Sequence, residues 1–170
     1  PAILGTSMKS VGEAMAIGRN FKESLQKALV SLEIGFSGLD KIFYLSKKEI
    51  EKKLKTNIPN KILLIAEAMR KKIKISKIHK LSKIDPWFLE QIEEIVNAEN
   101  DILKKGLPKN FNEFNKIKSM GFSDKRLSQL SSLEEKIVRR KRLALNILPV
   151  FKKVDTCAAE FKSFTPYMYS

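Results

Sequence analysis

The longest helical pattern in the chain covers residues 85–106, which read DPWFLEQIEEIVNAENDILKKG. Asp85 and Pro86 form a strong helix start. An Asp at the N-cap accepts a hydrogen bond from a backbone amide, and a Pro at the first helical position removes no hydrogen bond of the helix. Gly106 is a natural helix stop. The apolar residues between these signals lie at helical spacing: Phe88, Leu89, Ile92, Ile95, Val96, Ile102 and Leu103. The pattern predicts one long amphipathic helix.

Shorter helices are predicted on both sides of this segment. Four pairs of residues resemble capping boxes, in which an N-cap side chain and a Glu three residues later satisfy each other's backbone amides. These pairs are Asn20 with Glu23, Ser46 with Glu49, Asn110 with Glu113, and Ser132 with Glu135. The first pair opens a predicted helix from about 21 to 33, and the apolar run 62–69 predicts a more buried one.

The whole pattern contains almost no alternating strand signal, and we expect six or seven short helices. Residues 149–155 have little helical period and are expected to be extended. The basic stretch Lys71–Lys83 lies between two helical regions and is interpreted as a boundary between them. The fold class is therefore all-α: a compact multi-helix domain of two small helical lobes, about 20–75 and 84–148, with extended segments at the termini.

Length and composition exclude several other classes of protein. The chain has 170 residues, of which 43% are hydrophobic and 31% are charged, so wholesale disorder is not expected. Its 7 Gly and 6 Pro exclude a collagen-like chain. Cys157 is the single cysteine and is expected to be a small buried residue, which favours a reducing, cytoplasmic location. No apolar run is long enough to predict a membrane-spanning helix, and no membrane partner is expected.

The formal net charge of +14 at first favours nucleic acid as a partner, because Lys and Arg neutralise phosphates. However, 27 of the 33 cations are Lys and only 6 are Arg, whereas base contacts favour the planar Arg side chain. The many Lys, Ile and Asn together are also what an AT-rich coding sequence produces. The densest basic run, Arg139–Arg142, is expected to fan around a helix rather than form a stripe. We therefore expect no nucleic-acid partner, although a nucleic-acid-binding module stays open as an alternative.

The residues do not predict an active site. His79 is the only histidine, and it lies among several Lys, so a catalytic triad would depend on it alone. Neighbouring carboxylates such as Glu93 and Glu94 are typical of a solvated helix face rather than of an acid/base pair. Neither a dinucleotide-binding nor a phosphate-loop glycine pattern is present. From the residues alone we predict no catalytic, cofactor-binding or metal-binding residue in this chain.

Two terminal segments carry a family resemblance. Residues 4–29, which include MKSVGEAMAIGRN and KESLQKAL, resemble the segment after the first ATP-grasp unit in large chains of the carbamoyl phosphate synthetase family. Residues 149–170, with VDTCAAEF and TPYMYS, resemble the start of that family's second synthetase half. The central runs IDPWFLEQIE and GFSDKRL also match the family in order. The resemblance covers essentially residues 4–170, although the Lys-rich loops at 41–61 and 71–83 depart from it.

The resemblance implies a non-catalytic oligomerisation, or connection, domain between the carboxyphosphate-forming and carbamoyl-phosphate-forming halves of such an enzyme. Residues 1–19 would be the end of the preceding synthetase domain or a boundary helix, residues 20–148 the helical domain, and residues 149–170 an extended lead-in. The parent enzyme would use bicarbonate, glutamine-derived ammonia and two ATP, with Mg²⁺ (or Mn²⁺) and K⁺, for arginine and pyrimidine biosynthesis. Its expected partners are the flanking ATP-grasp domains, a small glutamine amidotransferase subunit and further large chains.

The apolar stripe of the first helix is the candidate surface for pairing large chains. It comprises Phe21, Leu25, Leu29 and Leu32, which follow the boundary segment directly. The alternative is that this stripe faces the domain's own core. Besides the nucleic-acid binder, a stand-alone basic helical adaptor also stays open as an alternative function.

Overall fold

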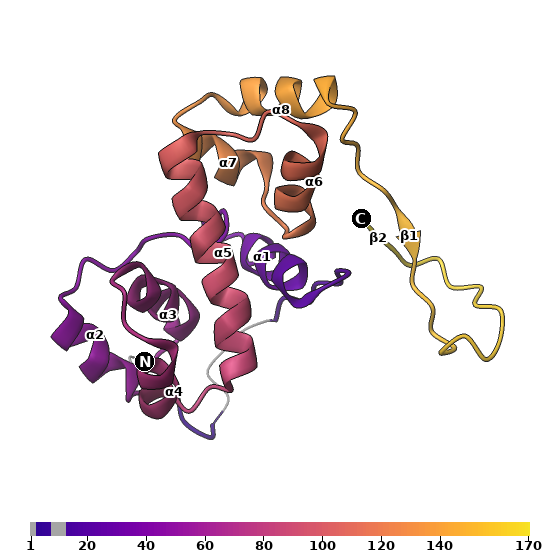
Figure 1. The fold of residues 1–170 in the computed structure, drawn as a ribbon. Coiled ribbons are helices and arrows are strands. Elements are labelled where there is room, and N and C mark those ends of the chain that lie inside the picture. The colour runs from indigo at the N-terminus through magenta and orange to yellow at the C-terminus, as the bar shows by residue number, and fades with distance from the viewer. Residues whose placement is uncertain (1–2, 8–12) are drawn as a thin grey trace.

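The computed structural model describes residues 3–7 and 13–170, and these residues form eight α-helices and one short β-hairpin (Figure 1). The helices are α1 (Phe21–Ser31), α2 (Lys47–Leu54), α3 (Lys61–Arg70), α4 (Ile75–Ser82), α5 (Pro86–Lys105), α6 (Phe111–Ser119), α7 (Asp124–Ser131) and α8 (Glu135–Ala144). The strands β1 (Lys152–Lys153) and β2 (Met168–Tyr169) pair antiparallel. The prediction of an all-α class is confirmed.

Helix α5 is the central element of the helical body, and helices from both sides pack against it. Helices α2, α3 and α4 gather around its N-terminal half, and α6, α7 and α8 around its C-terminal half (Figure 1). Its residues Leu89, Ile92, Ile95, Val96 and Ile102 are buried, as the sequence pattern predicts. The start is also as predicted, since the Asp85 side chain accepts a hydrogen bond from the Trp87 amide at 2.8 Å.

Most other predicted helix starts are confirmed, and one is wrong. Ser46 and Glu49 form a complete capping box, and the side chains of Asn20 and Asn110 accept hydrogen bonds from the third amide of their helices. Ser132, in contrast, ends α7 in a left-handed conformation with φ 55°, and α8 begins after Glu134 without a side-chain cap. The turn between these two helices is so short that Ser132 serves the end of one helix and not the start of the next.

The stretch Lys71–Lys83 is not a plain boundary, because it contains α4. This helix buries Ile78 and packs on α2 and α5. It brings the number of helices among the described residues to eight, against the six or seven expected. The sequence hides it because its N-cap residue, Lys74, makes no side-chain cap hydrogen bond and the Lys residues obscure the apolar spacing.

Within the first expected lobe, about 20–75, α1 contacts the second, about 84–148. Helix α1 lies beside the middle of α5 (Figure 1), where the Asn20 side chain donates to the Ser119 carbonyl at 3.0 Å and the Gln26 side chain to the Met120 carbonyl at 2.8 Å. The first helix in the sequence therefore packs against α5 and against the turn after α6. Since α5 is common to both groups, the body is a single packed unit.

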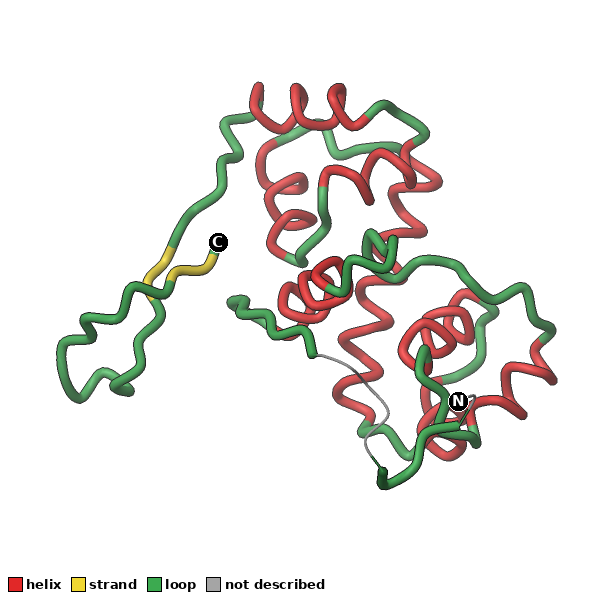
Figure 2. The backbone as a smooth tube through the Cα atoms, turned by 180° about the vertical axis from the view of Figure 1, so that it is seen from behind, coloured by secondary structure: helices red, strands yellow, loops and turns green. Residues whose placement is uncertain are grey.

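The terminal segments differ from the body. Residues 13–18 form neither helix nor strand, so the described part of segment 1–19 shows no boundary helix, and residues 8–12 lie outside the described part. Residues 149–170 form an arm that leaves the helical body and returns through β2 (Figure 2). The extended character predicted for 149–155 is confirmed. Cys157 lies in this arm and is only partly buried, in contrast to the expectation.

Candidate functional site

The predicted pairing stripe on α1 mostly packs within the chain. Leu29 is buried, and Phe21 and Leu25 are partly buried against the core. Leu32 ends α1 and is 43% exposed. Close to it, Val30 and Ile34 are 41% and 62% exposed. Of the four candidate residues, Leu32 therefore offers the most free apolar surface.

Phe21 belongs to a cluster of three aromatic rings at the start of α5. Its ring lies edge-on to Trp87 at 5.6 Å and to Phe88 at 5.1 Å between centroids, and those two rings are 5.0 Å apart. Such edge-to-face pairs add to the energy of burial and fix the orientation of each ring. Trp87 is nevertheless 51% exposed and Phe88 42%. The cluster thus joins α1 to α5 and leaves rigid aromatic surface on the outside.

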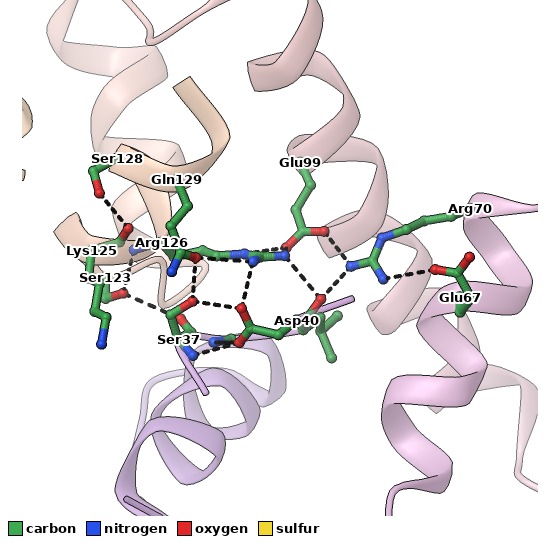
Figure 3. Close-up of polar contacts among 12 residues, drawn as sticks. Ser37, Asp40, Glu67, Arg70, Glu99, Ser123, Lys125, Arg126, Ser128 and Gln129 are labelled. Carbon is green, nitrogen blue, oxygen red and sulfur yellow. Dashed lines mark hydrogen bonds and ion pairs between the residues drawn. The ribbon is translucent and has the colours of Figure 1, made fainter. Parts of the chain in front are cut away.

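A buried ion network joins α5 to α7 (Figure 3). The Arg126 guanidinium on α7 donates to Glu99 of α5 from Nε at 2.9 Å and from Nη2 at 2.6 Å. The Arg126 Nη1 atom donates to Asp40 at 2.9 Å. Arg126 is 7% exposed and Glu99 2%. Each charge is therefore removed from water and depends on its partner, as buried charges in proteins must.

The same network reaches α3 through Arg70. Its Nη2 atom donates to the second Glu99 oxygen at 2.7 Å, while its Nη1 atom lies 3.6 Å from Glu67. Both Arg70 and Arg126 also donate to the backbone carbonyl of Leu39. One carboxylate, Glu99, and one carbonyl are thus shared by two guanidinium groups that come from opposite ends of the body.

The loop before α2 is fixed by this network. Asp40 accepts hydrogen bonds from the Ser37 amide at 2.6 Å and the Ser37 hydroxyl at 2.9 Å. The Ser37 hydroxyl oxygen also lies 2.7 Å from the side-chain oxygen of Gln129 on α7, which is the alternative acceptor of its single proton (Figure 3). Removing one member would leave a buried charge without its partner, which typically costs about 3–5 kcal/mol. The network therefore holds α3, α5, α7 and this loop in one arrangement.

A second ion cluster surrounds Glu23 on α1. The Glu23 carboxylate is 2% exposed and accepts hydrogen bonds from the Arg19 amide at 2.8 Å, the Arg19 side chain and Lys27 at 2.9 Å. Burial alone would raise the pKa of Glu23, but the hydrogen bonds from Arg19 and Lys27 outweigh it and lower this pKa to about 2. Glu23 is therefore a carboxylate throughout the neutral and mildly acidic range.

A third cluster ties α6 to α7 and to the end of α8. Asp124 accepts from Lys118 at 2.9 Å and from Arg142 at 3.1 Å. Burial lowers the pKa of Lys118. Burial alone would raise the pKa of Asp124, but Lys118 and Arg142 outweigh this effect and hold the Asp124 pKa below its usual value. Arg142, the last residue of the densest basic run, is thus used inside the fold rather than on the surface.

The rest of that basic run is exposed on α8. Lys136, Arg139 and Arg140 are exposed together with Leu143, and these positions fall three and four residues apart on one helix face. The run therefore fans around the helix as expected, because Arg142 turns inwards and the exposed Lys141 does not lie on the side that Arg139 and Arg140 share.

Among residues 3–7 and 13–170, no cluster of three or more His, Cys, Asp or Glu residues could hold a metal ion. His79 is exposed, and its Nδ1 atom is 2.7 Å from the carbonyl of Ile84. No described helix is long and apolar enough to cross a membrane.

The ion network was not predicted from the sequence, although a signal for it exists. Glu99 lies three residues after Val96 and three before Ile102, which puts a charge on the apolar face of α5. Glu67 likewise interrupts the apolar run of α3. A carboxylate on a core-facing position indicates a buried partner, such as a cation or several hydrogen-bond donors.

Fold and site together define a helical structural domain, in which buried charges hold helices in place. The family model for the oligomerisation domain of the carbamoyl phosphate synthetase large chain matches residues 13–146, and the chain belongs to this family. It is 48% identical to the carbamoyl phosphate synthase large chain of Brucella melitensis, over 99% of this chain and 15% of that one. Against the large chain of Haemophilus ducreyi the identity is 48%, over 98% and 16% of the two chains.

A plant protein is also similar. The arginine-specific carbamoyl phosphate synthase large chain of Oryza sativa, which is described as chloroplastic, is 44% identical over 99% of this chain and 15% of its own length. The chain thus spans about one sixth of the length of the curated relatives that it matches.

Proposed function

We propose that this chain is a non-catalytic spacer between two ATP-grasp synthetase units of a carbamoyl phosphate synthetase, and that it also pairs large chains. The domain boundaries that follow are 1–19 for the end of the preceding unit, 20–148 for the spacer and 149–170 for the lead-in to the next unit. The observation that carries the proposal is the shared Glu99 carboxylate, because Arg70 and Arg126 bind it from opposite ends of the body. A spacer needs such a body, one that does not bend between its two ends.

In this proposal the chemistry lies outside the chain. The flanking units would bind ATP, Mg²⁺ or Mn²⁺ and K⁺, and a small glutamine amidotransferase subunit would supply ammonia from glutamine. The product would serve arginine and pyrimidine biosynthesis, for which the arginine-specific plant relative gives support. We also propose a cytoplasmic location, since the lone Cys157 is a free thiol.

The spacer function is tested by replacing residues 20–148 with a flexible linker of equal reach in a full-length large chain. Each synthetase unit should still hydrolyse ATP, while carbamoyl phosphate formation should fall about 100-fold, because reacting sites that lose their relative placement lose the advantage of proximity. The measurement is carbamoyl phosphate formed per ATP consumed. Undiminished carbamoyl phosphate formation by the linker protein would refute the spacer function.

The pairing surface is tested at the exposed end of α1. Leu32→Glu places a charge on the apolar surface that Val30, Leu32 and Ile34 share, and charges at the centre of an interface strongly oppose association. We expect sedimentation velocity to show a smaller species with an unchanged helical circular dichroism spectrum. Lys41→Glu, on an exposed residue of the following loop, is the control for added negative charge. If Leu32→Glu associates as the parent protein does, the pairing surface lies elsewhere.

A further inference from the structure

The chain segments that lead into and out of the body meet at α1. A hollow of about 750 Å³ lies between them. Its walls include residues 15–17 of the incoming segment, Lys27, Val30 and Ser31 at α1, and residues 168–170 of the outgoing arm. Segments about 150 positions apart in the sequence therefore share one site on the outside of the body.

Lys27 contacts all three parts of this site. Its Nζ atom donates to the backbone carbonyl of Ile17 at 3.3 Å, to Glu23 on its own helix at 2.9 Å, and to the main-chain oxygen of Ser170. A lysine ammonium group has three donors, and here each has a partner in a different segment. One side chain thus connects the incoming segment, the helix and the arm.

Arg19 strengthens the same connection from the incoming side. It binds Glu23 through its backbone amide and its guanidinium group. The pKa of Arg19 is raised, first because its side chain hydrogen-bonds to Glu23, and the neighbouring Tyr169 of the arm adds a smaller electrostatic contribution. Arg19 and Lys27 therefore flank one carboxylate, and each faces a residue at the end of the arm.

The base of the site is rigid. A Cβ atom on Gly121 would lie 2.8 Å from the Cα atom of Glu23, so the turn after α6 packs directly on the α1 backbone. Glu23 is also held away from water with its negative charge opposed by two cations. The cluster is thus anchored to the body and extends only towards the two terminal segments.

We propose that Arg19, Glu23 and Lys27 form a clamp that fixes the incoming and outgoing chain segments to each other. This inference rests on the proposed spacer function, because the two segments would then lead to the two synthetase units. Lys27 is a positioning residue in this scheme and touches no substrate. By holding both segments on one helix turn, the clamp sets where the two units start relative to the body and so keeps their reactions coupled.

The test compares Lys27→Met with Lys22→Met in the full-length large chain with its glutaminase subunit. Lys22 is on the same helix and is also paired, with Gln91 and Glu94 of α5, but it touches neither terminal segment. For Lys27→Met, ATP consumed per carbamoyl phosphate should rise about twofold or more, since misplaced sites lose coupling before they lose their own chemistry. ATP hydrolysis by each unit alone should stay within about twofold of the parent. Lys22→Met should leave the ratio unchanged.

The outcomes separate the clamp from the spacer function. An unchanged ATP ratio in a folded Lys27→Met enzyme refutes the clamp and leaves the spacer intact. Undiminished synthesis after replacement of the whole body refutes the spacer itself. Lys27→Arg retains the cation and is expected to restore most of the coupling. A general effect of losing a paired lysine from α1 would appear in Lys22→Met and Lys27→Met alike.

A distance measurement tests the clamp directly. Spin labels on Met15→Cys and Met168→Cys, in a Cys157→Ser background, report on the two segments where both line the hollow. We expect one narrow distance distribution, which Lys27→Met broadens. The measurement is made both on residues 1–170 and on a chain that continues past Ser170. A broadening by Lys27→Met that occurs only in the shorter chain would show that Lys27 binds a free carboxylate, and this would overturn the proposal.

Discussion

The helical body and the C-terminal arm use the same kinds of residue in opposite ways. In the body, Phe114 and Phe122 are buried, and even Glu99 is 2% exposed. In the arm, Phe161 and Phe164 are 75% and 80% exposed, and the two strands have two residues each. The body buries most of its large apolar side chains and several paired charges, whereas the arm leaves its phenylalanine rings in water. We infer that the helical body provides most of the free energy of folding of this chain, and that contacts with α1 hold the arm in place.

The largest expected effect is on the ion network of the body. Arg126→Met removes the cation shared by Glu99 and Asp40 and leaves buried negative charge without a partner, which should lower the free energy of unfolding by about 3–5 kcal/mol. Urea denaturation followed by circular dichroism measures the loss. Lys125→Met, at the exposed neighbouring position, should change it by less than about 0.5 kcal/mol. Equal losses in the two variants would show that the network adds little.

The next effect is a pH dependence that originates at Glu23. Its pKa of about 2 in the folded chain lies below the ordinary value of 4.5, so folding favours the carboxylate. Glu23 therefore stabilises the fold fully above pH 4.5, and this contribution of about 3 kcal/mol is lost as the pH falls from 4.5 through 2.

Comparison with Glu23→Gln isolates this contribution, because the other carboxylates titrate in both proteins. The difference between their free energies of unfolding, measured in urea at a series of pH values, should shrink steadily as the pH falls from 4.5 towards 2. A difference that does not depend on pH would mean that Arg19 and Lys27 do not hold the carboxylate as described.

A somewhat smaller effect is expected where the turn after α6 meets α1. Gly121 has φ 92°, and an added Cβ would lie 2.8 Å from the Glu23 Cα atom, so Gly121→Ala combines backbone strain with a steric overlap and should cost about 2–3 kcal/mol. Gly35→Ala is the matched control, because Gly35 has φ 93° but no atom within 4 Å of the added Cβ. It should cost about 1 kcal/mol, from strain alone. Thermal unfolding of the two variants gives the comparison, and equal costs would argue against close packing at Gly121.

The smallest effect is expected in the arm. Phe164→Ala should change the free energy of unfolding by less than about 0.5 kcal/mol, because the ring is 80% exposed. The same substitution in the body, Phe114→Ala, should cost about 3–5 kcal/mol, since that ring is fully buried. Chemical denaturation of both proteins tests the contrast between arm and body. A large loss for Phe164→Ala would show that the arm contributes to the fold of the body.

The sequence allowed good predictions wherever local chemistry decides the structure. Asp85 and Pro86 start α5 because both signals act within one helical turn, and Ser46 with Glu49 does the same for α2. Prediction failed where tertiary contacts decide. Helix α4 has no side-chain cap and is stabilised by packing on α2 and α5, and Ser132 could not be assigned without knowing how α7 ends.

The ion network was beyond prediction in its geometry, though not in its existence. A Glu on the buried face of α5 indicates a buried partner. Which of the six Arg residues pairs with it depends on how α3 and α7 cross that helix. The contact of Lys27 with the arm is harder still to predict, because Lys27 and Ser170 are far apart in the sequence and meet only when the arm turns back. Long-range placement, rather than residue type, limits what can be predicted here.

The sharing of α5 has a consequence for how the chain unfolds. Helix α5 has twenty residues, and its buried side chains pack on α3 and α4 at one end and on α7 at the other. If one of these sets of contacts is lost, the remaining turns of α5 do not stay intact. The two groups of helices are therefore expected to melt as one cooperative unit, with equal calorimetric and van't Hoff enthalpies and no half-folded state between them.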